Sequence, residues 1–283
     1  MIDFPIVDTH VHLWDINNLS YPWLSDVPAL NRTFTLDDYN KACGDLKVEK
    51  MVFMQCECDI AQFKEEVAWV SELASKDKRL QGIIAWAPLE YGEGARGDIE
   101  ELKKNPLVKG VRRIIQFEPD LEFCLRPGFI KGVNLLPEYG LTFDICIAHF
   151  HNKNLLKFLD KCPGVPMILD HIGKPDIRNN ILDPWRSEIR EIAKFPNVYL
   201  KLSSLATEAD HSNWTVDGLR PYATHVIETF GIDRTIFASD WPVVTQAAGI
   251  PEAVETMLDI MKGCSREDLQ KVFYDNGKKF YKL

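Results

Sequence analysis

The sequence predicts an α/β protein, a (β/α)8 TIM barrel in a single domain over residues 1–283. Eight short apolar runs rich in β-branched residues begin at residues 6, 50, 82, 109, 142, 166, 198 and 235. Successive starts lie between 24 residues (142 to 166) and 44 residues (6 to 50) apart. This spacing is close to the roughly 30 residues that a strand-helix-strand unit needs. Eight such units favour a closed barrel, whose catalytic residues lie at the carboxyl ends of its strands.

Each predicted strand has a short apolar centre, and the segments between the centres have helical patterns. The centres are residues 6–12, 51–54, 82–86, 110–114, 142–147, 166–171, 198–202 and 235–240. Thr35 is placed to cap a short helix that begins at Leu36. The apolar stripe of the next helix consists of Phe63, Val67, Val70 and Ala74. Helices from Pro251 and from Ser265 would complete the barrel. A doubly wound sheet is the alternative fold, but no glycine-rich phosphate loop follows any strand.

Composition limits the partners and the compartment. A net charge of -9 without any Lys/Arg-rich block argues against nucleic acid or an anionic membrane as a partner. No apolar run reaches the roughly 18 residues of a membrane span, and no charged-then-apolar leader precedes the first strand, so we expect a cytoplasmic protein. Seven cysteines at irregular spacing suit a reducing compartment. Cys56 and Cys58 are one close pair, but no second Cys or His pair lies nearby to complete a metal site. The oligomeric state does not follow from the sequence.

Histidines and an aspartate stand at the ends of three predicted strands. His10 and His12 end the first strand, His171 ends the sixth and Asp240 ends the eighth. Side chains alternate along a strand, so His10 and His12 point to the same side, about 6 to 7 Å apart along the chain. Strand ends that carry His or Asp into one barrel mouth predict a catalytic site, rather than isolated structural histidines.

Two further pairs lie on or after neighbouring strands. Arg112 and Arg113 lie in the fourth strand, where only one of them can point into the mouth. We favour Arg112, whose fork of N–H donors suits paired substrate oxygens. His149 and His151 come just after the fifth strand and are candidate substrate contacts.

Four motifs carry a family resemblance over the whole chain. They are Asp-Thr-His-Val-His at 8–12, Leu-Asp-His-Ile-Gly-Lys-Pro at 169–175, Phe-Ala-Ser-Asp-Trp-Pro-Val at 237–243 and Asp-Asn-Gly-Lys-Lys-Phe-Tyr at 275–281. They resemble the amidohydrolase superfamily, and most closely its sugar-lactonase branch, which includes L-fuconolactonases, L-rhamnonolactonases and the 2-pyrone-4,6-dicarboxylate lactonase. Tyr-Pro-Trp-Leu at 21–24 is similar to the substrate-loop segment of those lactonases.

Departures from the superfamily pattern bear on the metal. A member with two metals would have a bridging Lys or Glu on strand four, where this chain has arginines, and a metal histidine inside strand five. His149 or His151 would supply that histidine only if strand five ran longer than we expect. The resemblance therefore implies at most one divalent ion, most simply zinc on His10, His12 and Asp240. It also allows none, because some lactonases of this branch work without a metal.

The predicted reaction is the opening of a sugar-acid lactone by water. Such a reaction needs a general base, which we assign to Asp240, and groups that polarise the carbonyl, which we assign to His10, His12 and His171. Two alternatives remain: a metal-dependent decarboxylase of the same superfamily, and a barrel that binds a carbohydrate without turning it over. An intact base favours a catalyst over a binding protein, since a binding site needs no base.

The roles of several other residues stay open or depend on the alternation of side chains along a strand. Lys174 is either a substrate contact or a solvated loop lysine, and Trp23 and Trp241 either stack on a sugar face or pack within loops. Asp8 is a candidate to orient a histidine. We expect Asp170 to face away from the side of His171 and His225 to be exposed. His211 is either a lid residue or without a role.

Overall fold

The computed structural model describes residues 2–283, and its eight strands form one parallel sheet in chain order. The strands are β1 (Ile6–Val11), β2 (Val48–Met54), β3 (Leu80–Ala85), β4 (Val108–Arg112), β5 (Thr142–Ile145), β6 (Met167–Leu169), β7 (Val198–Leu202) and β8 (Thr235–Phe237). The last strand meets the first where Asp240 N donates to His10 O (3.0 Å) and His12 N donates to Trp241 O (2.7 Å). These bonds close the sheet, and the predicted (β/α)8 barrel is confirmed.

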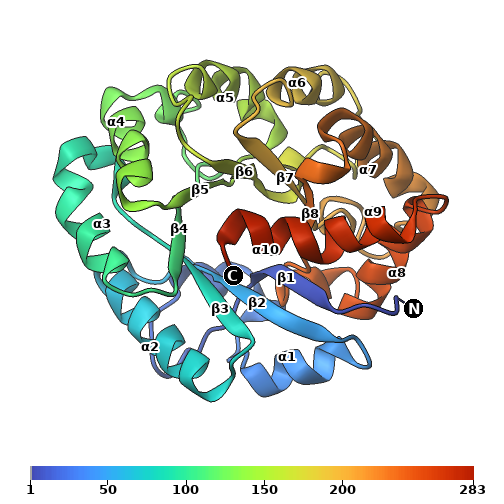
Figure 1. Ribbon diagram of the computed structural model, residues 1–283, viewed down its shortest axis with the longest axis horizontal. Coiled ribbons are helices and arrows are strands. Elements are labelled where there is room, and N and C mark those ends of the chain that lie inside the picture. Colours follow the sequence, from blue (N-terminus) through green and yellow to red (C-terminus); the bar gives the residue numbers. More distant parts are fainter. Residues whose placement is uncertain (1) are drawn as a thin grey trace.

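Helices surround the strands on the outside (Figure 1). They are α1 (Leu36–Cys43), α2 (Phe63–Lys76), α3 (Arg96–Lys103), α4 (Pro127–Leu135), α5 (Asn152–Leu159), α6 (Trp185–Ile192), α7 (Val216–Phe230), α8 (Ile250–Ile260), α9 (Arg266–Gln270) and α10 (Asn276–Tyr281). Thr35 caps α1 as predicted, in a reciprocal arrangement with Asp38. On α2, the predicted stripe is buried at Val67, Val70 and Ala74. Burial of this stripe against the sheet fixes the helix in place.

Predicted and observed strands begin within two residues of each other, but several observed strands end sooner. β5 ends at Ile145, so it does not extend to the two histidines that follow it. β6 and β8 end at Leu169 and Phe237, short of His171 and Asp240. The reason is local: His171 and Asp240 have φ angles of 53° and 60°, which take the chain out of the extended conformation.

The last helix covers one end of the barrel, where α10 runs across the centre of the view (Figure 1). Phe280 and Tyr281 pack there against interior side chains of the strands, including Ile168 and Ile236. Gly277 allows this close packing, because a Cβ at that position would lie 2.6 Å from the Thr9 Cγ2 atom. The closed end leaves the carboxyl ends of the strands as the open mouth.

Helix α7 differs from the prediction at one residue. His225 is buried, and its Nε2 lies 2.8 Å from the carbonyl oxygen of Arg186 on α6. The expectation that His225 is exposed was wrong, because α7 also packs against its neighbouring helix and not only against the sheet.

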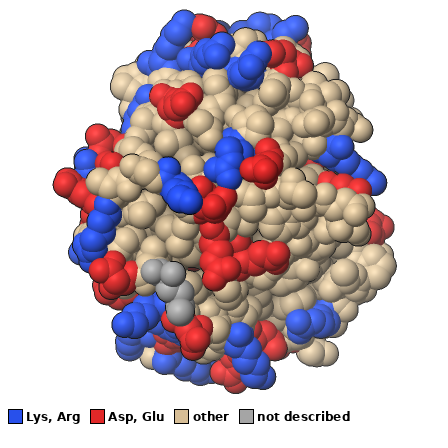
Figure 2. All heavy atoms as spheres, turned by 90° about the vertical axis from the view of Figure 1, so that its right-hand side faces the viewer, with Lys and Arg blue, Asp and Glu red and all other residues tan. Residues whose placement is uncertain are grey.

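None of the helices among residues 2–283 is long and apolar enough to cross a membrane. Basic and acidic side chains are interspersed on the face shown in Figure 2.

Candidate active site

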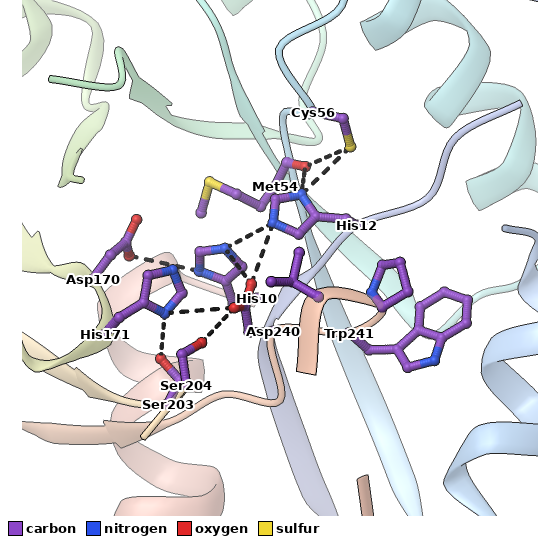
Figure 3. Close-up of polar contacts among 12 residues, drawn as sticks. His10, His12, Met54, Cys56, Asp170, His171, Ser203, Ser204, Asp240 and Trp241 are labelled. Carbon is purple, nitrogen blue, oxygen red and sulfur yellow. Dashed lines mark hydrogen bonds and ion pairs between the residues drawn. The ribbon is translucent and has the colours of Figure 1, made fainter. Parts of the chain in front are cut away.

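Three side chains at the carboxyl ends of the first and last strands converge at the mouth of the barrel (Figure 3). The Nε2 atoms of His10 and His12 are 3.1 Å apart. Asp240 Oδ1 lies 3.4 Å from each of those two nitrogen atoms. All three residues are buried. The structure thus brings together the two histidines at the end of β1 and the aspartate that follows β8, as the sequence predicted.

These three atoms match the spacing of ligands around one metal ion. A tetrahedral zinc with bonds of about 2.0 to 2.1 Å holds its ligand atoms about 3.3 Å apart. The Nδ1 atom of His12 lies 2.9 Å from the carbonyl oxygen of Met54, which fixes the proton on Nδ1 and leaves Nε2 as an electron-pair donor. His10, His12 and Asp240 therefore fit a single divalent ion with nitrogen and oxygen ligands.

A second group of possible ligands is His10, Asp170 and His171. The ammonium of Lys201 already lies among them, with Nζ 3.0 Å from Asp170 Oδ1 and 3.3 Å from His10 Nδ1. A second cation placed there would be repelled by this ammonium. The arrangement therefore favours one metal ion at most.

Burial and neighbouring charges set the protonation of the site. Burial, with Lys201 nearby, lowers the pKa of His10 well below its ordinary value, and burial also lowers the pKa of His12. Burial lowers the pKa of His171 to about 4. Burial alone would raise the pKa of Asp240, but His171 and the two histidines of β1 hold that pKa below its usual range. At neutral pH Asp240 is therefore a carboxylate among neutral imidazoles.

Asp240 and His171 are held by two serines that follow β7. Ser204 donates its hydroxyl hydrogen bond to Asp240 Oδ2, and Ser203 Oγ lies 2.9 Å from His171 Nδ1. Since Oδ2 is occupied in this way, Oδ1 is the oxygen of Asp240 directed toward the imidazoles of His10 and His12. Both serines are buried. They fix the orientation of the carboxylate and of the imidazole.

A cavity of about 460 Å³ opens beside these residues. Its lining comprises His12, Trp14, Trp23, Asp26, Val27, Leu30, Cys56, Glu57, Arg112, Ile114, Gln116, Phe117, Cys146, His171, Lys174, Asp240, Val243 and Gln246. This volume falls in the range of small-molecule sites, which is about 300 to 1,000 Å³. The carboxylate of Asp240 thus lies on the wall of a cavity large enough for a single small molecule.

Of the two arginines, Arg112 lines the cavity. Its Nη2 donates to the carbonyl oxygen of Gln55 (2.7 Å), and its Nε has no hydrogen-bond partner among residues 2–283. Arg113 instead pairs with Glu90 (3.2 Å) and Glu118 (2.5 Å). The alternation of β4 therefore directs Arg112 into the mouth, as we favoured.

Trp23 and Lys174 also line the cavity, whereas three other candidate contacts do not. Trp241 is buried and packs edge-on against Phe34 and Tyr39. His149 Nδ1 lies 3.0 Å from the carbonyl oxygen of Lys174. His151 is buried against the backbone of Ala148, 3.2 Å from its carbonyl oxygen. The structure does not place Trp241, His149 or His151 around the cavity in which we expected them.

Asp170 contradicts our expectation that it faces away from His171. It lies inside the barrel, 3.0 Å from Lys201 and 3.6 Å from both His10 and Arg112. Alternation along β6 carries Asp170 inward after Ile168, and the left-handed turn then brings His171 to the same side. Against burial, which would raise it, Lys201 holds the pKa of Asp170 well below its usual range. Asp170 is therefore an ionised partner of the site.

Sequence reasoning missed Lys201 and overrated Asp8. Lys201 is fully buried on β7 and its Nζ lies 2.6 Å from Asp144 Oδ2. A lysine between leucines in an apolar strand was the available signal, since buried lysines are rare without a carboxylate partner. Asp8 accepts hydrogen bonds from the hydroxyl of Tyr39 and the backbone N–H of Ser239. It contacts only the backbone of His10, so it does not orient an imidazole ring.

Comparison with known proteins identifies the class of this protein. The amidohydrolase family model matches residues 7–283. The chain belongs to the amidohydrolase family, and it is a hydrolase. The resemblance of its motifs to the sugar-lactonase branch is confirmed by its relatives.

Two of those relatives match over nearly their whole length. An L-fucono-1,5-lactonase of Burkholderia ambifaria is 27% identical, with 98% of this chain and 95% of the relative covered. An L-rhamnono-gamma-lactonase of Scheffersomyces stipitis is 26% identical, with both chains fully covered. A solved amidohydrolase from Burkholderia multivorans with bound zinc superimposes with a TM-score of 0.88 at 24% identity, covering 99% of this chain and all of the other. That similarity shows the shared fold.

Proposed function

We propose that this protein hydrolyses a lactone of a sugar acid, such as L-fucono- or L-rhamnono-lactone. One observation carries the proposal: an ionised Asp240 on the wall of a single-molecule cavity, 3.4 Å from two imidazole nitrogens. The full-length similarity to an L-fucono-1,5-lactonase and an L-rhamnono-gamma-lactonase supports this substrate class. We further expect a small-molecule substrate, no nucleic-acid partner and a cytoplasmic location.

In this mechanism Asp240 acts as the general base. It takes a proton from a water molecule whose oxygen bonds to the lactone carbonyl carbon, and the bond from that carbon to the ring oxygen then breaks. That proton passes to the released alkoxide, so the products are a hydroxyl group and a carboxylic acid, which then loses its remaining proton to solvent and becomes a carboxylate. The site offers no Ser or Cys activated by a histidine as a nucleophile: Ser203 contacts His171 but does not line the cavity, and burial raises the pKa of Cys56 well above its ordinary value. Attack by water is therefore the simplest route.

Other residues hold the substrate and stabilise developing charge. Arg112 lines the cavity, and its guanidinium is the candidate to stabilise the oxyanion. His171, neutral and held by Ser203, is a hydrogen-bonding group beside the reacting carbonyl. Trp23 and Lys174 line the same cavity as candidate contacts to the sugar.

The residues also fit one divalent ion, for which zinc is our first choice. His10, His12 and Asp240 would hold it, and a bound ion would polarise the carbonyl and lower the pKa of water. The protein's own contribution is to keep both imidazoles neutral and the carboxylate ionised.

A weakly buffered pH-indicator assay over a panel of aldonolactones tests the proposal, because each turnover releases an acid. We expect acid release above the buffer rate from at least one 6-deoxy sugar lactone. Rates equal to buffer on every lactone, with loss of CO2 from an unsaturated dicarboxylate, would instead support a metal-dependent decarboxylase. Binding without turnover of any compound would support a carbohydrate-binding barrel.

A further inference from the structure

Glu57 is a cavity residue to which the reaction assigns no role. It follows β2 with a φ angle of 51°, a left-handed conformation that is unfavourable for a residue with a side chain. His171, Lys174 and Asp240 are also cavity residues with positive φ. Because unfavourable backbone of this kind collects at functional sites, Glu57 is a candidate for a role in the same site.

The carboxylate of Glu57 is held in a fixed position by one neighbour. Gln55 Nε2 donates to Glu57 Oε1 (2.8 Å), and the backbone N–H of Glu57 donates to Gln55 Oε1 (2.7 Å). Gln55 is itself fully buried, and its carbonyl oxygen accepts a bond from Arg112. Glu57 Oε2 accepts no hydrogen bond from the residues that the structure describes. One oxygen is therefore anchored and the other is available to a ligand.

The charges around the cavity favour an uncharged ligand. Both cations of the lining already have carboxylate partners: Lys174 lies 3.3 Å from Glu208, and Arg112 lies 3.6 Å from Asp170. The lining also contains the carboxylates of Asp26, Glu57 and Asp240. A second negative group on the substrate, away from the reacting carbonyl, would therefore be repelled by these three carboxylates.

An apolar wall lies next to Glu57. Trp23 Nε1 donates to the carbonyl oxygen of Cys56 (2.8 Å), which ties the indole to the residue that precedes Glu57. The rings of Trp23 and Trp14 meet edge to face at 5.5 Å, and both line the cavity. A carboxylate beside indole rings suits a sugar ring, which offers hydroxyl donors on one side and C–H groups on the other.

We propose that Glu57 determines specificity by accepting hydrogen bonds from neighbouring hydroxyls of an uncharged polyhydroxylated lactone, and that the cavity rejects lactones bearing a further carboxylate or sulfonate. This inference rests on the proposed lactonase function and narrows its substrate class. It separates this chain from a relative such as the 4-sulfomuconolactone hydrolase of Rhizobium radiobacter, whose name denotes an anionic lactone.

Matched pairs of lactones test it. Galactono-1,4-lactone and glucono-1,4-lactone carry a hydroxymethyl group where galactaro-1,4-lactone and glucaro-1,4-lactone, respectively, carry a carboxylate. We expect the wild-type protein to hydrolyse the uncharged member of the better pair at least about tenfold faster in kcat/KM. In Glu57→Gln, which keeps the shape and removes the charge, this preference should fall at least about tenfold, mainly through a higher KM for the uncharged lactone. Glu65→Gln, at an exposed position on α2, is the control and should keep the wild-type preference.

A second variant separates this role from a structural one. Glu57→Gly suits the left-handed backbone, so its melting temperature should equal or exceed that of the wild type while KM for the uncharged lactone rises. A large loss of stability in Glu57→Gly, or an unchanged preference in Glu57→Gln, would overturn the assignment. Equal or faster hydrolysis of the aldarolactones by the wild type would overturn the inference and leave the lactonase function intact. No turnover of any lactone would overturn both.

Discussion

Glu66 on α2 tests whether burial keeps a carboxyl group protonated in the folded protein. It is fully buried, its Oε1 accepts a bond from Cys56 N (3.1 Å), and its Oε2 has no partner among residues 2–283. Burial raises the pKa of Glu66 to about 8 from its ordinary value of 4.5. The folded protein therefore keeps a proton on Glu66 that the unfolded chain has released between these two values.

The sign and size of the effect follow from this shift. The contribution of Glu66 to folding is fully present below pH 4.5 and is lost as the pH rises toward 8. The difference of 8 - 4.5 = 3.5 pKa units, at about 1.36 kcal/mol per unit, corresponds to about 5 kcal/mol over the whole range. Between pH 5 and pH 8 the expected loss is about 3 to 4 kcal/mol.

The perturbation is Glu66→Gln, which keeps the shape and cannot ionise. Urea unfolding at pH 5, 6, 7 and 8 gives the free energy of unfolding of both proteins. The variant should gain on the wild type by about 3 kcal/mol between the lowest and highest pH. Glu65→Gln, one residue away and exposed, should follow the wild-type curve. Parallel curves for Glu66→Gln and the wild type would refute the reasoning, because Glu66 would then be ionised in the folded protein.

Three further predictions concern the site. Asp240→Asn should fold and bind substrate nearly as the wild type does, while kcat falls at least about a hundredfold, the scale of general base catalysis; wild-type turnover at every pH would rule out Asp240 as the base. Elemental analysis of the purified protein should find no more than one divalent ion per chain, and His12→Ala should lose it; two tightly bound ions would show that the ammonium of Lys201 does not exclude the second. Lys201→Met should lose about 3 to 5 kcal/mol of stability by urea unfolding, because it leaves buried carboxylates unpaired; an unchanged midpoint would mean that Asp170 and Asp144 are protonated.

The barrel was predictable because its signal repeats. Each strand is a short run of β-branched and apolar residues at a spacing that one crossover can fill, so an error at one strand does not disturb the others. The pair His10 and His12 was predictable for a similar reason, since His10 lies in β1 and His12 directly follows Val11, the last residue of that strand, so alternation still holds. The place of Asp240 at the barrel mouth was also predictable from its position after the eighth apolar run. Its backbone conformation was not, because β8 ends at Phe237 and Asp240 lies in the turn that follows.

Lys201 and Asp170 show where sequence reasoning stops. The two residues are 31 positions apart in the chain (170 to 201), and nothing in the local sequence indicates that β6 and β7 direct both side chains into the barrel interior. Alternation gives two faces for a strand but does not say which face is inside. In this barrel the inner face of β7 carries a lysine whose Nζ is 2.6 Å from Asp144 Oδ2, and Tyr281 from α10 donates its hydroxyl to the same oxygen at 2.6 Å. Only closure of the barrel brings these groups together.

The residues that line the cavity could not be predicted together from the sequence, because many of them follow strands in turns that have no sequence signature. Six of the non-glycine residues with positive φ follow strands at the mouth: Glu57, His171, Ile172, Lys174, Ser204 and Asp240. Glycine would mark such positions in a sequence, but here side chains with chemical functions occupy them, so the turns carry no local signature. Each turn redirects a side chain that alternation alone would have placed elsewhere. The unfavourable backbone at these positions is the physical cost of directing a base, an imidazole and an anchored carboxylate at one small volume.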